Sequence, residues 1–186
     1  MKRITLILLS LLTTFIFVSC NNATPPANDN QEQNVQEVRK KNPACAEIAS
    51  SIIDSFSINV DEFDYYNFGE EEKKLDEMVI SLFYGDMESG ETPDFSHVTD
   101  YYVLIPVTTA ATEIGVFKVN DAQNTKAMKQ YFKNRASSRA TTFAPYDEVE
   151  SQKAKNVLIS AYDEYVWYII TDINQDIEAK ILEAVR

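Results

Sequence analysis

The stretch YYVLIPVTTAATEIGVFKVNDAQNTKAMKQYF, residues 101–132, decides the fold. Residues 101–107 predict a strand with apolar side chains on both faces, which indicates that both faces are covered. Residues 108–112 turn the chain, and residues 113–119 predict the partner strand. Gly115 lies in this second strand, where a glycine indicates the close approach of another group. The stretch therefore begins with a β-hairpin.

A helix and a second hairpin follow. Asn120-Asp121 predict the start of a helix that runs to about Arg139, with Met128, Tyr131, Phe132 and Ala136 on its apolar side. A short polar helix is expected over residues 147–155. Residues 157–160 and 165–171 predict two further strands, of which the second is the most apolar and should be central. A last helix begins at Asn174, with Ile177, Ile181, Leu182 and Val185 inward.

Two helices are predicted before the first hairpin. Asn42-Pro43 is typical of a helix start, and an apolar stripe follows at helical spacing, made of Cys45, Ile48, Ala49, Ile52, Ile53 and Phe56. The aromatic residues 61–69 are interpreted as a short helical turn. The second helix runs from about Glu71 to Tyr84, with Leu75, Met78, Val79, Leu82 and Phe83 inward.

These elements predict an α+β fold. Two hairpins form a four-stranded antiparallel sheet, and each hairpin is followed by a helix. The helices after the hairpins share one face of the sheet, and the two N-terminal helices pack on the other. Residues 42–186 are expected to form one globular α+β domain.

Residues 1–19 predict a lipoprotein signal peptide. Lys2 and Arg3 precede an uncharged run, residues 4–18, which is short for a membrane span but typical of a signal-peptide core. The run ends in Phe17-Val18-Ser19-Cys20, which resembles a bacterial lipobox. That resemblance implies lipid attachment at Cys20, through diacylglyceryl and fatty acyl chains such as palmitate. An ordinary secretory signal that ends near a cysteine is the alternative.

The remaining N-terminal residues predict a flexible tether. Residues 20–41 hold the expected lipidated cysteine and a polar stretch that buries too little apolar area to order itself. Acyl chains anchor a protein by burying methylene groups, at about 0.8 kcal/mol each. We therefore expect an extracytoplasmic protein of a bacterial cell envelope, held to the membrane by its lipid.

The net charge of the chain argues against two classes of binding partner. The formal net charge is −12, which opposes binding to nucleic acid and to anionic lipid surfaces. Contact with the membrane is accordingly expected through the lipid anchor alone. A protein or a glycan remains a possible ligand of the folded part.

Several residues resemble a family of bacterial lipoproteins known as domain of unknown function 4358. The resemblance rests on Glu113-Ile114-Gly115-Val116-Phe117-Lys118, the helix with Arg135, Phe143 with Tyr146, and a final apolar strand before a helix. It spans roughly residues 75–186 and the lipidated leader. Pro145 precedes Tyr146 here, whereas the family pattern places a proline after the tyrosine. The resemblance implies location and fold, without catalytic residues.

The long loop 85–100 holds the weak candidates for a metal site, because loops of this length are often functional. Asp94, His97 and Asp100 recur every three residues and present the ligand types of a divalent cation. A solvated polar loop explains the same residues. His97 is also the only histidine in the chain, so the sequence predicts no catalytic residues and no Ser-His-Asp set away from it.

No cofactor is predicted. Gly85 and Gly90 have the glycine spacing of a phosphate-binding loop, but Glu91 stands where that loop needs a lysine. Cys45 is interpreted as a small buried hydrophobe, with a reactive or intermolecular thiol as the alternative.

Three functions stay open at this point. The first is a non-enzymatic binding or interaction domain displayed outside the cytoplasmic membrane. The second is a metal-dependent hydrolase that uses the loop 85–100, and the third is a structural spacer in the envelope. Aromatic residues on or beside the predicted strands would serve either a binding surface or the core; they are Tyr101, Tyr102, Tyr162, Tyr165, Trp167 and Tyr168.

Overall fold

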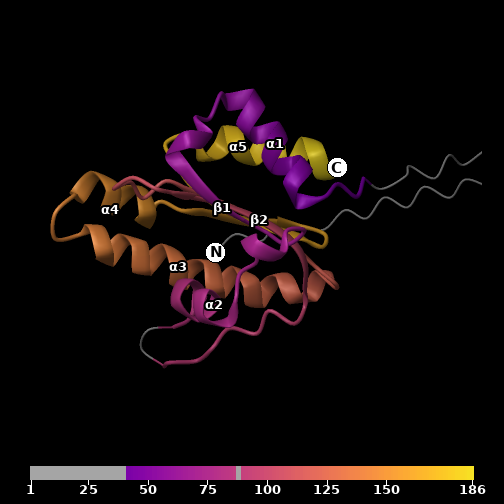
Figure 1. Ribbon diagram of the computed structural model, residues 1–186, viewed down its shortest axis with the longest axis horizontal. Helices are drawn as coiled ribbons and strands as arrows, with labels where there is room; N and C mark the ends of the chain where they lie inside the picture. The colour runs from indigo at the N-terminus through magenta and orange to yellow at the C-terminus, as the bar shows by residue number, and fades with distance from the viewer. Residues whose placement is uncertain (1–40, 87–88) are drawn as a thin grey trace, which may run out of the picture. The chain divides into compact units, whose positions relative to one another are not determined.

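A five-stranded antiparallel sheet lies between two layers of helices in the computed structural model, which describes residues 41–86 and 89–186 (Figure 1). The predicted signal peptide, Cys20 and the tether up to residue 40 lie outside the described residues. Within residues 41–86 and 89–186, no helix combines the length and the hydropathy that a membrane span requires.

The sheet has the strand order β1-β2-β3-β5-β4, and every neighbouring pair is antiparallel. Its strands are β1 (Phe63–Asn67), β2 (Val98–Pro106), β3 (Glu113–Val119), β4 (Leu158–Tyr162) and β5 (Tyr165–Ile170). Both predicted hairpins are confirmed: β2 pairs with β3, and β4 pairs with β5. The most apolar strand, β5, was predicted to be central; it lies inside the sheet between β3 and β4 and is buried along its whole length.

The prediction of four strands is wrong because the chain forms a fifth, β1. Residues 63–67 were expected in a helical turn, and they pair with β2 from Phe63 opposite Pro106 to Asn67 opposite Tyr102. Aromatic residues favour strands because their rings pack well on a pleated surface. Five residues are too few for the two-residue periodicity to stand out from a helical pattern.

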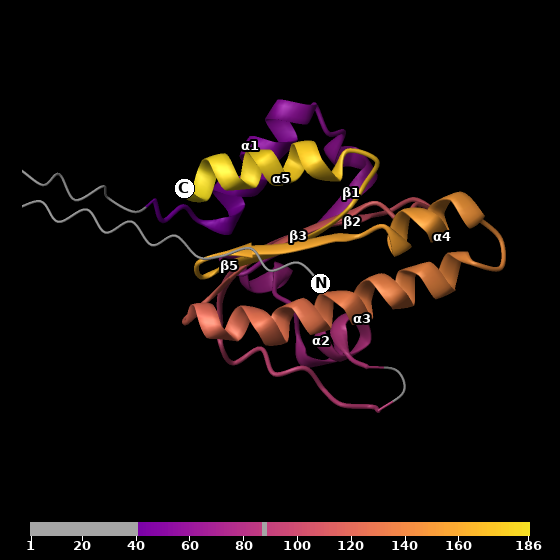
Figure 2. The same cartoon turned by 180° about the vertical axis from the view of Figure 1, so that it is seen from behind.

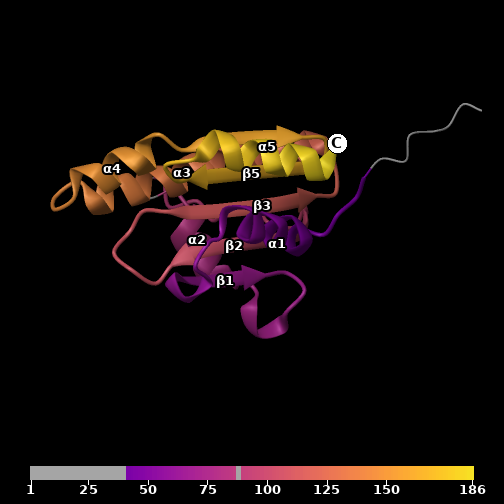
Figure 3. The same ribbon diagram turned by 90° about the horizontal axis from the view of Figure 1, so that it is seen from above.

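The helices divide differently from the prediction. They are α1 (Cys45–Phe56), α2 (Glu77–Tyr84), α3 (Thr125–Phe143), α4 (Glu148–Lys155) and α5 (Asn174–Val185), with short 3-10 turns at Val60–Glu62, Glu71–Lys73 and Ala122–Asn124. α1 and α5 cover one face of the sheet, and α2, α3 and α4 lie on the other (Figures 2 and 3). The helices after the two hairpins, α3 and α5, therefore lie on opposite faces. An apolar stripe shows that one side of a helix is buried, but it does not indicate on which face of the sheet the helix packs.

Alternation along the strands supplies both layers with a core. On β3, Ile114 and Val116 face α1 and α5, whereas Phe117 and Val119 face α2 and α3. The buried side chains of α3 (Met128, Phe132 and Ala136) and of α5 (Ile177, Ile181 and Val185) match the predicted stripes. Both faces are therefore covered, as the apolar pattern of residues 101–107 indicated.

The inward side predicted for the second helix is confirmed in part: Leu75, Val79 and Phe83 pack on the core, but two other residues do not. Met78 and Leu82 were expected inward and are 74% and 70% exposed, whereas Tyr84 is fully buried. The helix is also shorter than predicted: it begins at Glu77, after Asp76 accepts a hydrogen bond from the Val79 N–H at 2.7 Å. Eight residues with apolar side chains on several sides do not determine which side turns inward.

Candidate functional site

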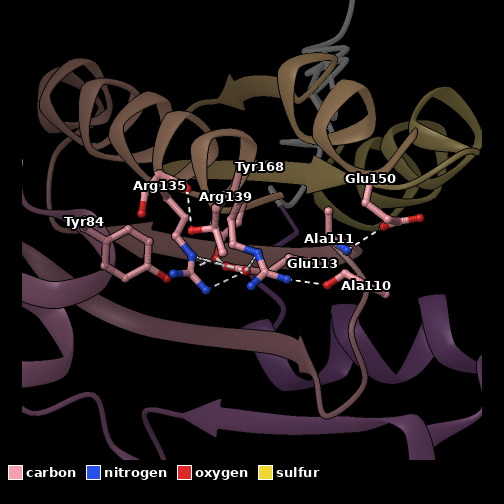
Figure 4. Close-up of polar contacts among 10 residues, drawn as sticks. Tyr84, Ala110, Ala111, Glu113, Arg135, Arg139, Glu150 and Tyr168 are labelled. Atoms are coloured by element: carbon pink, nitrogen blue, oxygen red, sulfur yellow. Dashed lines mark hydrogen bonds and ion pairs between the residues drawn. The ribbon is translucent and has the colours of Figure 1, made fainter. Parts of the chain in front are cut away.

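A buried ionic network joins the sheet to α3 (Figure 4). Glu113, the first residue of β3, has no solvent exposure, and Arg135 on α3 is 6% exposed. The Arg135 Nε donates to both carboxylate oxygens of Glu113, at 2.9 and 3.1 Å, and its Nη2 donates to Oε2 at 2.8 Å. Such a bidentate pair satisfies a charge that would otherwise be costly to bury.

Two tyrosines and a second arginine complete this network. Tyr168 on β5 donates its hydroxyl hydrogen to Glu113 Oε1, and the Tyr84 hydroxyl lies 3.1 Å from that of Tyr168. Arg139, one helical turn after Arg135, has its Nε 3.8 Å from Glu113 Oε2 and donates from Nη2 to the Ala110 carbonyl. The network thus connects α2, α3, β3, β5 and the β2–β3 turn.

Burial and charge shift the pKa values of the two tyrosines and of Arg135 in this network. Burial, reinforced by the charge of Glu113, raises the pKa of Tyr168 well above its usual value and raises the pKa of Tyr84 in the same direction. Burial alone would lower the pKa of Arg135, but the charge and hydrogen bonds of Glu113 outweigh it and raise that pKa. At neutral pH the two tyrosines are therefore neutral and the guanidinium of Arg135 is charged.

The closed position of the network assigns it a structural role. Glu113, Tyr84 and Tyr168 have no exposed surface, so a substrate cannot reach their polar atoms. The guanidinium of Arg135 also lies 4.0 Å from the centre of the Phe83 ring, which adds a cation–π contact with α2. The arrangement holds α2 and α3 against the sheet.

Sequence reasoning did not identify this network, although a signal was present. Arg135 and Arg139 follow Phe132 at spacings of three and seven, which places both on the apolar side of α3. Glu113 likewise begins a strand whose next four residues, 114–117, carry no charge or polar side chain. Two inward arginines on a helix that follows such a strand predict a buried ion pair.

The structure does not bring the three metal-site candidates together. Asp94 and His97 form a loose pair, with 3.8 Å between Asp94 Oδ2 and His97 Nε2. Asp100 instead accepts a hydrogen bond at 2.7 Å from the backbone N–H of Cys45, at the start of α1. Within residues 41–86 and 89–186, no group of three His, Cys, Asp or Glu side chains is placed to hold a metal ion.

Cys45 lies in the core, as one of its two interpretations predicted. It is a free cysteine with 0% exposure, between α1 and the sheet. Burial is the main cause that raises the pKa of its thiol, and the nearby Asp100 raises it further. A thiol in this setting is a poor nucleophile, because the thiolate is the reactive form.

Most of the strand aromatics serve the core. Tyr101, Tyr165, Trp167 and Tyr168 are between 0% and 4% exposed. Tyr102 is half-buried and stacks on Tyr65, with 5.4 Å between the ring centres, and Tyr162 is 38% exposed. Trp167 faces α1 and α5, whereas Phe95 of the long loop packs on the opposite cluster. The tryptophan and this loop therefore do not share a cleft.

The surface carries a hollow between α3 and α4, which we call the α3–α4 hollow. Its volume is about 450 Å³, and it is lined by Lys133, Ala136, Ser137, Ala140, Thr141, Ala144, Ala154, Lys155 and Val157. The alanines at residues 136, 140 and 154 are buried and form an apolar floor between the two lysines. A larger hollow of about 660 Å³ lies at the start of α5, where Lys153 is already paired with Glu150 and Asp172.

Comparison with known proteins connects the chain to one family. No curated protein and no solved structure matches it. Residues 94–171, from the long loop to the end of β5, match the family described as Domain of unknown function (DUF4358). This match covers the ionic residues Glu113, Arg135 and Tyr168, and it supports the family that the sequence resembles.

Proposed function

We propose that this protein is a lipid-anchored binding domain displayed outside the cytoplasmic membrane. The observation that carries the proposal is the lipobox-like ending Phe17-Val18-Ser19-Cys20 after an uncharged run. The structure supports the assignment of the anchor to Cys20, because Cys45, the other cysteine, is buried between α1 and the sheet. A lipid on Cys20 would hold the acidic domain at a membrane that its net charge alone would avoid.

Two features of the domain support a binding role: a closed polar network in its interior and an open hollow on its surface. The buried groups Glu113, Arg135 and Tyr168 are engaged with one another, and the α3–α4 hollow lies outside that network. A protein ligand suits this surface better than a glycan, since the strand aromatics that would stack on sugar rings are mostly buried.

The anchor is tested with two cysteine variants. We expect Cys20→Ala to move the protein from the membrane fraction to the soluble fraction and to remove the mass of the lipid from its N-terminus. Cys45→Ala is the matched control, because it also deletes a thiol, and it should leave the protein in the membrane fraction. An unmodified N-terminus at Cys20 in the wild-type protein would reject the anchor.

The binding role has a separate test. Cross-linking in intact cells, followed by purification of the full chain, should recover a specific protein that the same purification from cells without the chain does not recover. A substrate turnover by the purified chain that one side-chain substitution abolishes, without loss of folding, would contradict a binding role and establish an enzyme.

A further inference from the structure

The strand β4 forms an edge of the sheet with unpaired backbone groups. Among the described residues its one strand neighbour is β5. Tyr162 pairs with Tyr165 across a two-residue turn, and Ile159 pairs with Tyr168. Hydrogen-bonded and non-hydrogen-bonded pairs alternate from such a turn. The N–H and C=O groups of Ile159 and Ala161 therefore point away from β5.

This edge lacks the features that usually prevent strand addition. The sequence of β4, Leu-Ile-Ser-Ala-Tyr, contains no charge and no proline, and its pairing with β5 has no bulge. The opposite edge of the sheet differs, since β1 contains Asp64, which binds Lys73 at 2.7 Å. Of the two edges, β4 is the one that can accept another strand.

Positive charge lies beside this edge on α3, which contacts β4. Lys126, Lys129 and Lys133 are spaced by three and four residues, so they share one flank of the helix, which we call the lysine flank. α3 contains no acidic residue, although the whole chain has a net charge of −12. Within residues 41–86 and 89–186, these three lysines have no carboxylate oxygen within 4.0 Å.

The lysine flank leads into the α3–α4 hollow. Lys133 lines the hollow together with Val157, the residue immediately before β4. Ala136 and Ala140 continue the same side of α3 and form part of the hollow's apolar floor. An extended chain paired with β4 would thus pass the lysines on its α3 side and meet an apolar recess near residue 157.

We propose that β4 binds an extended acidic segment of a partner protein as a sixth strand, and that the lysine flank binds its carboxylates. Main-chain hydrogen bonds to Ile159 and Ala161 supply affinity, and the lysines select acidic side chains. An apolar side chain of the segment enters the α3–α4 hollow. This inference rests on the proposed binding role and names the class of ligand for it.

A defined peptide tests the proposal on the full chain. The probe is a blocked nonapeptide of alternating valine and glutamate, and the control peptide has lysine in place of glutamate. We expect the acidic peptide to bind and to slow hydrogen exchange at residues 158–162. The basic peptide should bind at least about tenfold more weakly, because it meets like charge. An acidic peptide with N-methylated backbone amides should lose binding, since it cannot form the main-chain bonds.

Charge-reversed variants locate the contact. Lys126→Glu with Lys133→Glu should lower the affinity of the chain for the acidic peptide by about tenfold or more. Lys73→Glu with Lys74→Glu is the matched control, because it changes net charge equally beside β1, at the opposite edge of the sheet. The affinity of this control variant for the acidic peptide should stay within about twofold of the wild type. Equal losses in the two double variants, or slowed exchange elsewhere than residues 158–162, would overturn the proposal.

Two further outcomes separate this inference from its alternatives. Concentration-dependent dimerisation of the chain that the acidic peptide does not displace would assign the edge to a second copy and reject the peptide. A partner recovered from cells that still binds the Lys126→Glu/Lys133→Glu variant would preserve the binding role and reject the β4 edge as its site.

Discussion

The ring of Tyr168 on β5 lies directly over Gly115 of β3, its partner in the strand register. A Cβ at residue 115 would stand 2.2 Å from Cε1 of that ring and 2.8 Å from Cζ. The glycine lets the tyrosine lie flat across the neighbouring strand, where its hydroxyl reaches Glu113. The close approach that the sequence indicated at Gly115 is therefore confirmed, and the approaching group is an aromatic ring.

Gly115→Ala should destabilise the fold, because the new methyl group must displace either the buried Tyr168 ring or the strand itself. Overpacking of this kind costs about 1–3 kcal/mol, and displacement of the ring also weakens the bond to Glu113. Urea unfolding followed by circular dichroism measures the loss. Gly69→Ala is the control, since a Cβ there has its nearest neighbour at an ordinary 3.6 Å. Equal stabilities of the two variants would contradict this account.

Glu113→Gln should cost about 3–5 kcal/mol, because it leaves the buried guanidinium of Arg135 without its counter-charge. Glu164→Gln is a suitable control: its carboxylate is partly exposed and lies 4.0 Å from Lys118 Nζ. Its cost should be below about 1 kcal/mol. Chemical unfolding of both variants gives the two values on one scale.

A double variant distinguishes the charge imbalance from simple loss of packing. Glu113→Gln with Arg135→Met removes both charges, so it should be less destabilised than the sum of the two single variants. The difference between the double variant and the sum of the single variants measures the interaction energy of the ion pair. Strict additivity would show that the two residues act independently and would reject the bond drawn between them in Figure 4.

Alkaline pH should weaken the fold through the buried tyrosines. In the folded state, burial raises the pKa of Tyr84 and of Tyr168 above their ordinary value of 10.0. Above pH 10 the unfolded chain releases both protons while the folded chain retains them, so the free energy of unfolding falls as pH rises. The slope should reach about 1.4 kcal/mol per pH unit for each buried tyrosine.

Urea unfolding between pH 8 and pH 11 measures this slope. Tyr84→Phe should reduce it, because phenylalanine has no proton to release. Tyr146→Phe, which alters a ring that is 65% exposed, should leave the slope unchanged. Equal slopes for the wild type and Tyr84→Phe would show that Tyr84 ionises as readily in the folded state as in the unfolded chain.

The sequence predicted those parts of the fold in which periodicity and turn signals agree. The β2–β3 and β4–β5 hairpins have apolar strands separated by short turns, and α5 has apolar residues at strict helical spacing. The sequence missed strand β1 and wrongly placed Met78 and Leu82 of α2 inward. Both elements are short, and tertiary contacts decide the conformation of short segments. Local pattern also could not assign α3 and α5 to opposite faces of the sheet.

The candidate site was less predictable than the fold. Asp94, His97 and Asp100 look alike in the sequence, but the chain separates them when Asp100 binds the start of α1. The contact between Glu113 and Arg135 joins residues 22 positions apart and depends on the way α3 packs under β3. An open edge such as β4 becomes visible only when the order of the strands is known.

Cys45 should resist thiol reagents in the folded protein. Its side chain is buried, so the reagent cannot reach it. Burial also raises the pKa of its thiol, so little of the reactive thiolate form is present. Titration with an aromatic disulfide should find no reactive thiol without urea and one after unfolding, because an acylated Cys20 carries no free thiol. Two thiols after unfolding would show an unmodified Cys20. A fast-reacting thiol that persists in Cys20→Ala would show that Cys45 is accessible.

Asp100→Ala should destabilise the protein by about 0.5–2 kcal/mol, because the Asp100 carboxylate caps the first turn of α1. α1 has no side-chain cap of its own at Ala44, so the acceptor must come from β2. Asp94→Ala is the matched control: the Asp94 side chain is 62% exposed, and its removal should change stability little.

Thermal unfolding with and without added zinc or calcium distinguishes helix capping by Asp100 from metal binding. A metal held by Asp94, His97 and Asp100 would raise the melting temperature of the wild type, and both variants would lose that increase. A cap predicts instead that Asp100→Ala alone melts earlier, by the same amount with or without the metal.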